Sequence, residues 1–174
     1  REDSGERISD WLASFNNVQV CSIEQAADIA DLIIIATAPK HVREVAYWLG
    51  DVRNKVIIDA TSNIHAPDEE LVKTICAIQA ITGSIHIVKA FNTRGYEQIL
   101  KPLFRDQKVE LILMGDSIKA KEIMKILAVE LGIHYSFDFG GNENVLIFNE
   151  LTKCWRNLKQ VSTPVHAAIR VLKH

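Results

Sequence analysis

Several signatures of metal-binding, membrane and nucleic-acid-binding proteins are missing from this sequence of 174 residues. Its three cysteines, Cys21, Cys76 and Cys154, lie far apart, so their spacing builds neither a metal site nor a disulfide framework. Scattered, unpaired cysteines favour a reducing, cytoplasmic setting. No apolar run approaches the roughly 20 residues of a membrane-spanning helix. The net charge of -2 gives no indication of nucleic-acid or membrane-surface binding.

Catalytic constellations are equally scarce. The residue order shows no Ser/His/Asp arrangement of the kind used for hydrolysis and no pair of acids of the kind used for glycoside chemistry. The phosphate-binding fingerprint G-x-G-x-x-G is absent, and Gly140-Gly141 does not replace it because this pair lies at the wrong end of the chain. The sequence therefore indicates no catalytic residue and no metal ligand.

Short apolar runs alternate with helical patterns along the chain. This alternation predicts an α/β fold with a Rossmann-like, doubly wound parallel sheet. The run at 31–38 is apolar on both faces, which is typical of an interior parallel strand. We expect strands within residues 18–20, 31–38, 55–61, 86–92, 109–115 and 134–139, and helices over 4–15, 22–30, 39–50, 68–80 and 116–132.

Capping residues support several of these helices. Ser22 and Gln25 form a capping box, and Pro39 suits the first turn of a helix. Asp116 is expected to cap the helix over 116–132. The residues of that helix predicted to face the core are Ile123, Leu127 and Leu131.

The last part of the chain has a different pattern. Residues 142–160 are predicted to form one long helix. We therefore divide the chain into a Rossmann-like domain over residues 1–141 and a helical extension over residues 142–174. The extension would either close the sheet or form a dimer contact, and we expect a homodimer. The inward positions of the long helix are Val145, Phe148, Leu151, Trp155 and Leu158.

Small hydrogen-bonding residues follow five of the expected strands. In an open parallel sheet ligands bind beyond the carboxyl ends of the strands, so these residues are candidate binding residues at one shared edge. Polar loops and helix caps would produce the same pattern at any single strand, but the first three loops together favour a crevice. The five segments are Thr37-Ala38-Pro39, Thr61-Ser62-Asn63, Asn92-Thr93-Arg94, Gly115-Asp116-Ser117 and Gly140-Gly141-Asn142.

Two charged residues lie inside expected strands. Asp59 is expected to hydrogen-bond a neighbouring loop, which is a structural role rather than that of a general base. Lys89 alternates with apolar residues and is expected either to be a cation of the crevice or to lie on a solvated face. The pattern does not separate these two alternatives.

Five segments, taken in order, resemble the coenzyme F420-dependent NADP oxidoreductase family. Its relatives include the cytosolic reductase domain of the STEAP metalloreductases and the N-terminal domain of pyrroline-5-carboxylate reductase. The resemblance covers essentially the whole chain, and VKAFNT in this order is a fairly specific motif. The segments are ATAP (36–39), NKVIIDATSN (54–63), VKAFNT (88–93), LMGD (113–116) and DFGG (138–141).

The resemblance implies an NADP-binding site at three of the strand ends. Thr37, Ala38 and Pro39 would lie along the dinucleotide, near the pyrophosphate and the nicotinamide ribose. Thr61, Ser62 and Asn63 would flank the nicotinamide, and Asn92 and Thr93 would close the pocket and face the second substrate. Hydride transfer between two bound rings needs positioning rather than an acid or a base, which agrees with the missing catalytic residues.

The chain also departs from the family pattern. Asn63 stands where the family has proline, and the DAG turn is replaced by Asp138-Phe139-Gly140. The first strand and the Gly-rich turn have no counterpart, so we expect roughly 30–35 further residues, the length of one βαβ start, upstream of Arg1 in the natural protein. Arg1 would occupy the position that holds the 2′-phosphate of NADP.

The leading hypothesis is a cytoplasmic NAD(P)-dependent oxidoreductase. It would transfer hydride between NADP(H), or NAD(H), and a flavin-type or deazaflavin-type partner such as coenzyme F420. The alternative is a catalytically weak dinucleotide-binding or dimerising scaffold module that lacks the Gly-rich turn. A third hypothesis is a reductase of a small imine or β-hydroxyacid, but such proteins carry a separate helical domain for which the last 33 residues leave little room.

Overall fold

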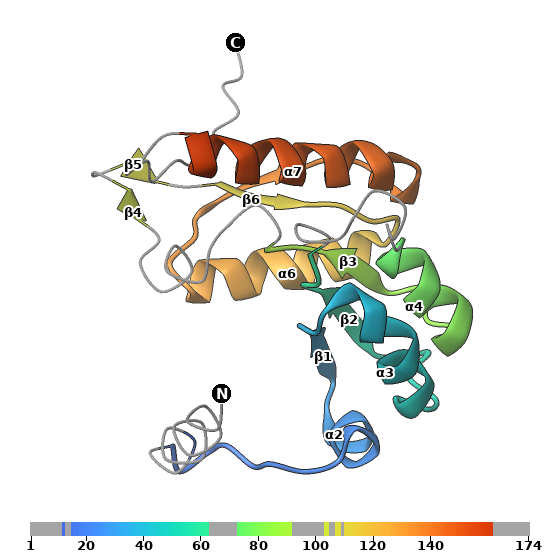
Figure 1. The fold of residues 1–174 in the computed structure, drawn as a ribbon. Helices are drawn as coiled ribbons and strands as arrows, with labels where there is room; N and C mark the ends of the chain where they lie inside the picture. Colours follow the sequence, from blue (N-terminus) through green and yellow to red (C-terminus); the bar gives the residue numbers. More distant parts are fainter. Residues whose placement is uncertain are drawn as a thin grey trace.

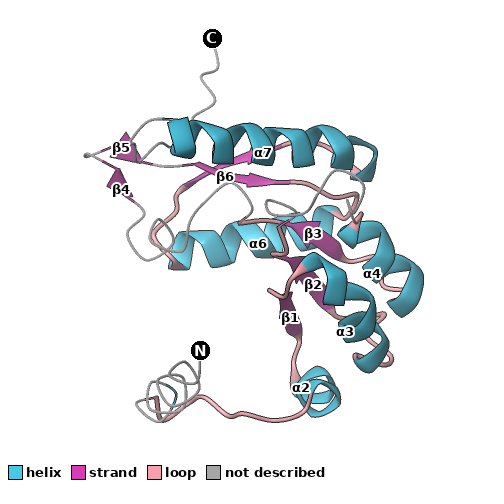
Figure 2. Cartoon of the chain, in the orientation of Figure 1, coloured by secondary structure: helices cyan, strands magenta, loops and turns pink. Residues whose placement is uncertain are grey.

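Strands and helices alternate along the chain in the computed structural model, as the apolar runs predict (Figures 1 and 2). The structure describes residues 12, 15–62, 73–91, 103–104, 107–108 and 110–161. The expected helix over 4–15 lies outside these residues, apart from positions 12 and 15. The main strands are β1 (Leu32–Ile35), β2 (Val56–Asp59), β3 (Ile87–Lys89), β6 (Glu110–Leu113) and β7 (Tyr135–Asp138). The α-helices are α2 (Ile23–Ile29), α3 (Val42–Trp48), α4 (Thr74–Thr82), α6 (Ile118–Glu130) and α7 (Val145–Val161).

The first three strands form a parallel sheet in the order β1-β2-β3. Within the described residues β2 is therefore the interior strand, and its four positions are all buried. Within the described residues, the prediction of an interior position for the strand at 31–38 is wrong. The strand β1 pairs there with β2 alone, and Ile34 is 50% exposed. An apolar run shows that a strand is covered by side chains, but it does not show that both of its edges are paired.

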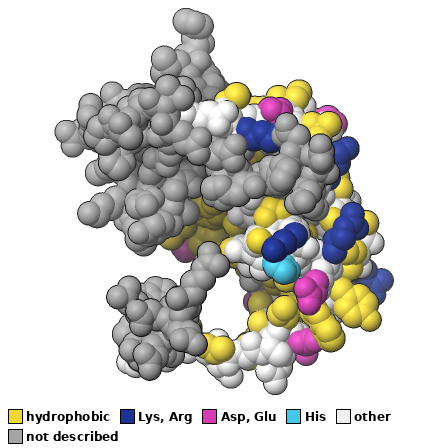
Figure 3. All heavy atoms as spheres, viewed as in Figure 1, with side chains coloured by type: hydrophobic (Ala, Val, Ile, Leu, Met, Phe, Trp, Pro, Cys, Tyr) yellow, Lys and Arg dark blue, Asp and Glu magenta, His cyan; other side chains and the backbone are white. Residues whose placement is uncertain are grey.

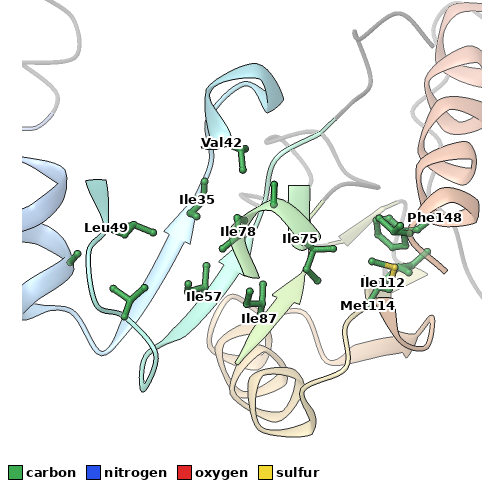
Figure 4. Close-up of a cluster of buried hydrophobic side chains, with 14 residues drawn as sticks. Ile35, Val42, Leu49, Ile57, Ile75, Ile78, Ile87, Ile112, Met114 and Phe148 are labelled. Carbon is green, nitrogen blue, oxygen red and sulfur yellow. The ribbon is translucent and has the colours of Figure 1, made fainter. Parts of the chain in front are cut away.

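Helices cover both faces of this sheet, which confirms the doubly wound arrangement. On one face Ile57 of β2 and Ile87 of β3 belong to a hydrophobic cluster with residues of α3 and α4 (Figure 4). On the other face Ile58 and Val88 pack in a second cluster with α6, to which Met124 contributes. The side chains of a strand alternate between the two faces of a sheet, so successive residues of β2 and β3 contribute to different clusters.

The second pair of strands runs in the opposite direction. β6 and β7 are parallel to each other, but Lys89 and Met114 form an antiparallel bridge in which each N–H donates to the other's carbonyl oxygen, at 2.7 and 3.0 Å. β6 therefore ends toward the amino end of β3. The prediction that all five strand ends share one edge is wrong for the last two, because apolar periodicity carries no information about strand direction.

Gly115 marks the point where β6 turns away from β3. Its φ is +152°, and a Cβ atom built on it would lie 2.7 Å from the carbonyl oxygen of Ile87. Only glycine allows the two backbones to approach so closely. The His86 ring, just before β3, lies 3.2 Å from the Ser117 hydroxyl, which confirms that this strand end meets the amino end of β3.

The helix ends follow the expected caps with one exception. Ser22 and Gln25 form the predicted capping box, and Pro39 opens the 3-10 turn Pro39–His41 that leads into α3. α6 is capped by Ser117 and not by Asp116, because the Asp116 carboxylate accepts a hydrogen bond from the backbone of Asn142 instead.

The core-facing side of α6 also differs from the prediction. Ile123 and Leu127 are partly buried against the second cluster, but Leu131 is 38% exposed. Small side chains and the long Met124 fill the centre of the contact, because α6 approaches the sheet closely. The buried residues of α6 are Ala120, Lys121, Met124 and Ala128.

The C-terminal helix packs on the sheet. After the 3-10 turn Asn142–Asn144, α7 runs alongside β6 on the side away from α6 (Figure 1). Val145 and Phe148 are buried in the first cluster and Leu151 packs against it, as predicted. The side chains of Trp155 and Leu158 lie outside the described residues, and the domain boundary after residue 141 stays a prediction.

Two smaller features complete the fold. Residues 18–20 form no strand, since Val18 and Val20 are 46% and 75% exposed and have no strand partner in the described part. A short antiparallel pair, β4 (Leu103–Phe104) and β5 (Gln107–Lys108), was not predicted because its strands have two residues each. On the face seen in Figure 3, acidic and basic side chains are interspersed with hydrophobic ones.

Candidate functional site

The carboxyl ends of β1, β2 and β3 lie side by side. Ile35, Asp59 and Lys89, the last residues of the three strands, are register partners. The backbone ladder continues one residue further. The N–H of Ala60 donates to the carbonyl oxygen of Ile35 at 2.9 Å, and the N–H of Ala90 donates to the backbone carbonyl oxygen of Asp59 at 3.1 Å. The three loops that follow therefore leave the sheet at one edge, which we call the carboxyl edge. It is where ligands bind in open α/β sheets.

The first loop carries Thr37, Ala38 and Pro39. Thr37 is half-buried, and its hydroxyl donates a hydrogen bond to the carbonyl oxygen of Ala38 at 3.3 Å. Ala38 is exposed, and Pro39 begins the helical turn next to it. The loop offers one hydroxyl and no charge, a surface along which a ligand can lie.

The second loop carries Thr61 and Ser62. Thr61 is 1% exposed, whereas Ser62 is half-buried. The Ser62 Oγ atom is enclosed and has no hydrogen-bond partner in the part of the chain that the structure describes. Leaving such a hydroxyl unpaired costs free energy, so Ser62 is a group that a bound ligand would satisfy.

Beneath the second loop lies a buried ion pair. The Lys89 Nζ atom is 2.8 Å from Asp59 Oδ2, and the two side chains are 1% and 0% exposed. Both alternatives predicted for Lys89, a crevice cation and a solvated cation, are therefore wrong. The prediction that Asp59 bonds a loop is confirmed, because its Oδ1 atom accepts the Thr61 N–H at 3.0 Å.

The third loop begins with a left-handed residue. Phe91 has a φ of +68°, and it is the one non-glycine residue with positive φ in the described ranges. A bulky side chain adopts this conformation only where its surroundings impose it. Phe91 packs against the second cluster, which holds it there. The backbone thus turns sharply where the VKAFNT motif leaves the sheet.

Four of the candidate residues cannot be placed at this edge. Arg1, Asn63, Asn92 and Thr93 lie outside the described residues. The structure brings together Thr37, Ala38 and Pro39 with Thr61 and Ser62, and it separates from them the segments after β6 and β7. The role of all the candidate residues in binding a cofactor stays a prediction.

A cavity of about 330 Å³ extends along the edge of β1 that has no strand partner in the described residues, and it reaches Thr37. Its lining is almost entirely aliphatic, so the cavity itself is no phosphate site. Residues of α2, β1 and α3 form it: Ile23, Ala26, Ala27, Ala30, Leu32, Ile33, Ile34, Ile35, Ala36, Thr37, Val45 and Leu49.

The described residues contain neither a candidate metal site nor a candidate membrane-spanning helix. They hold no cluster of His, Cys, Asp or Glu side chains that could bind a metal ion. None of their helices is long and apolar enough to cross a bilayer.

Sequence reasoning missed the partners of the ion pair. Thr74, the first residue of α4, donates to Asp59 Oδ2 at 2.5 Å and accepts from Lys89 at 2.8 Å. One signal was present in the sequence: Asp59 and Lys89 each end an apolar run in consecutive strands. Opposite charges at equivalent positions of neighbouring strands form cross-strand pairs.

Comparison with known proteins supports the resemblance noted in the sequence. The family described as NADP oxidoreductase, coenzyme F420-dependent, matches residues 2–63, so the resemblance is confirmed there. No curated protein matches the sequence significantly.

Solved structures share the fold at low identity. A putative F420-dependent NADP reductase from Arthrobacter sp. FB24 is 18% identical with a TM-score of 0.74, and the match covers 88% of this chain and 74% of that one. A hypothetical protein from Sinorhizobium meliloti is 21% identical with a TM-score of 0.65, covering 81% and 70%. Pyrroline-5-carboxylate reductase from Coxiella burnetii is 12% identical with a TM-score of 0.57, covering 91% and 54%. The chain therefore has the Rossmann-like α/β fold of NAD(P)-dependent dinucleotide-binding domains.

Proposed function

We propose that this chain is part of an NADP-dependent oxidoreductase whose nicotinamide site lies at the carboxyl edge of β1–β3. Hydride would pass between NADP(H) and a flavin-type or deazaflavin-type second substrate such as coenzyme F420. The observation that carries the proposal is the loop after β2. There the enclosed Ser62 hydroxyl, without a partner in the described chain, lies at the edge where an open α/β sheet binds its ligand.

The chemistry of the edge fits hydride transfer. Thr37, Thr61 and Ser62 supply hydroxyls and backbone groups and no side-chain charge, and the ion pair beneath them is neutral overall. Such a surface can position a nicotinamide ring but has no side chain suited to acid–base work. Direct hydride transfer between two rings needs this positioning above all.

The pyrophosphate would be held by residues other than the described ones. The open edge of β1 and the apolar cavity beside it have the form of a surface that accepts a further strand and its helix. A strand and a Gly-rich turn seated there would complete the dinucleotide site.

The remaining assignments are also proposals. Arg1 would contact the 2′-phosphate and favour NADP over NAD, while Asn63, Asn92 and Thr93 would close the nicotinamide pocket. We further propose a homodimer and a cytoplasmic location. A catalytically weak binding module is the second candidate, because the open edge of β1 would leave a dinucleotide partly unsupported.

Titration of the protein with NADPH tests the proposal. Binding should enhance or shift the fluorescence of the reduced nicotinamide, and Ser62→Ala should weaken it by about 3- to 10-fold, the value of roughly one hydrogen bond. Ser136→Ala, an exposed serine of β7 away from this edge, is the control and should bind as the wild type does. Absence of saturable NADPH binding by the wild type would refute the proposed function.

A further inference from the structure

The Lys89–Asp59 pair makes its remaining side-chain hydrogen bonds to Thr61, in the loop after β2, and to Thr74, the first residue of α4. Lys89 Nζ has three protons, and its acceptors are Asp59 Oδ2 at 2.8 Å, Thr74 Oγ1 at 2.8 Å and the Thr61 carbonyl oxygen at 3.0 Å, with the Thr61 hydroxyl oxygen farther away at 3.4 Å. Asp59 Oδ1 accepts both the N–H and the hydroxyl proton of Thr61, at 3.0 and 2.5 Å. The N–H, O–H and C=O groups of Thr61 are thus all bonded to one ion pair.

This arrangement is an unfavourable way to stabilise a fold. Two charges lose their hydration when they are buried, and apolar residues of similar volume often serve stability equally well. The surrounding positions are apolar, since Ile57 and Ile87 precede the pair on the same face of β2 and β3. The pair therefore calls for an explanation other than stability.

The Thr61 carbonyl provides one. In a planar trans peptide the C=O of one residue and the N–H of the next point in opposite directions. Because Lys89 holds the Thr61 carbonyl toward the ion pair, the N–H of Ser62 points away from it. The buried pair thereby fixes the direction of a backbone donor next to the Ser62 hydroxyl that has no partner in the described chain.

We propose that Lys89 and Asp59 are positioning residues that aim the Ser62 amide and hydroxyl at the nicotinamide half of the bound dinucleotide. Thr74 belongs to the same device, because it bonds both members of the pair and anchors them to the start of α4. This inference rests on the proposed function. It adds that selectivity for the nicotinamide half depends on charges that no ligand touches.

The test compares two ligands on the full-length protein. NADPH carries the nicotinamide, whereas 2′-phospho-ADP-ribose shares its other half and lacks the ring. In the double variant Asp59→Asn, Lys89→Met the charges leave together and side-chain volumes are nearly kept. The Kd of NADPH should rise about tenfold or more, while that of 2′-phospho-ADP-ribose should change by less than about twofold. Thr152→Val, a buried threonine of α7 bonded to its own helix, is the matched control and should leave both Kd values unchanged.

A second readout follows the loop itself. Hydrogen exchange of the Thr61 amide should accelerate about tenfold in the double variant, because a neutral acceptor replaces a charged one, while the Ile58 amide inside β2 should be unaffected. Thr74→Ser should behave as the wild type and Thr74→Val should resemble the double variant. Equal losses for both ligands, or an unchanged Thr61 amide, would refute the positioning role. A wild-type protein that binds neither ligand would instead refute the proposed function on which that role rests.

Discussion

The two edges of the sheet look alike in sequence and differ in structure. At the carboxyl edge of β1–β3, Thr61 is bonded to a buried ion pair and Ser62 has an enclosed hydroxyl without a partner in the described chain. At the opposite edge, where β6 and β7 end, Lys121 Nζ donates to Asp138 at 2.7 Å and to the Gly140 carbonyl at 3.0 Å, and the Asn142 Oδ1 atom is likewise enclosed without a partner in the described chain.

The two edges differ in the burial of the ion pair beneath the loop. Both edges carry small residues after apolar runs, and both contain a lysine–aspartate pair. At the carboxyl edge the pair is buried, and Thr61 in the loop above it is bonded to both of its members. At the opposite edge Asp138 is 45% exposed on its side chain, and it pairs with Lys121 in contact with water.

The largest expected effect comes from breaking the buried pair on one side only. Lys89→Met leaves the Asp59 carboxylate buried without its counter-charge, so we expect a loss of about 3–5 kcal/mol in the free energy of unfolding. The equivalent change at the opposite edge, Lys121→Met, should cost below about 1 kcal/mol, since Asp138 can be hydrated. Urea unfolding at pH 7 measures both, and similar losses would show that the two pairs do not differ as described.

The antiparallel approach of β6 to β3 predicts the next effect. Gly115→Ala would place a Cβ atom 2.7 Å from the Ile87 carbonyl oxygen at a φ of +152°, so we expect a loss of about 2–4 kcal/mol from strain and overpacking. Gly50→Ala is the control, because its φ is +65° but nothing lies within 4 Å of the new atom; it should lose only about 1 kcal/mol. If the two alanine variants unfold at the same temperature, the strands are not packed in this way.

The smallest effect concerns the exposed ion pair between Arg53 and Asp51, at the turn between α3 and β2. The hydrogen bonds that Arg53 donates lower the pKa of the Asp51 carboxyl from 3.8 to about 2. A lowered pKa in the folded state means that the stabilisation is complete above about pH 4 and is lost as the pH falls through about 2. Asp51→Asn should remove this small pH dependence and leave stability at pH 7 nearly unchanged. Acid titration of the melting temperature for both proteins checks it, and a large loss at pH 7 would contradict it.

Local patterns predicted much of this fold. The apolar runs at β1, β2 and β3 and the helical pattern over 39–50 place these strands and α3 within a few residues of their observed bounds. The Ser22 capping box and Pro39 depend on neighbours in the chain, and both were confirmed. Of the candidate site, the sequence placed Thr37 and Thr61 at strand ends, which the structure shows side by side.

Long-range features could not be predicted in the same way. The direction of β6, the cap at Ser117 and the exposure of Leu131 depend on which elements approach one another after folding. The resemblance to a known family anticipated the Rossmann-like fold, but it did not reveal that Lys89 is buried.

The amino-acid sequence by itself determined the alternation of strands and helices and the polar ends of the strands, because these are properties of neighbouring residues. Only the tertiary structure decided that three strand ends form one edge, that two lie at the opposite edge, and that Asp59, Lys89 and Thr74 meet beneath the Thr61–Ser62 loop. Such contacts join residues 15 and 30 positions apart in the chain, and their energies arise only when the sheet and α4 enclose them.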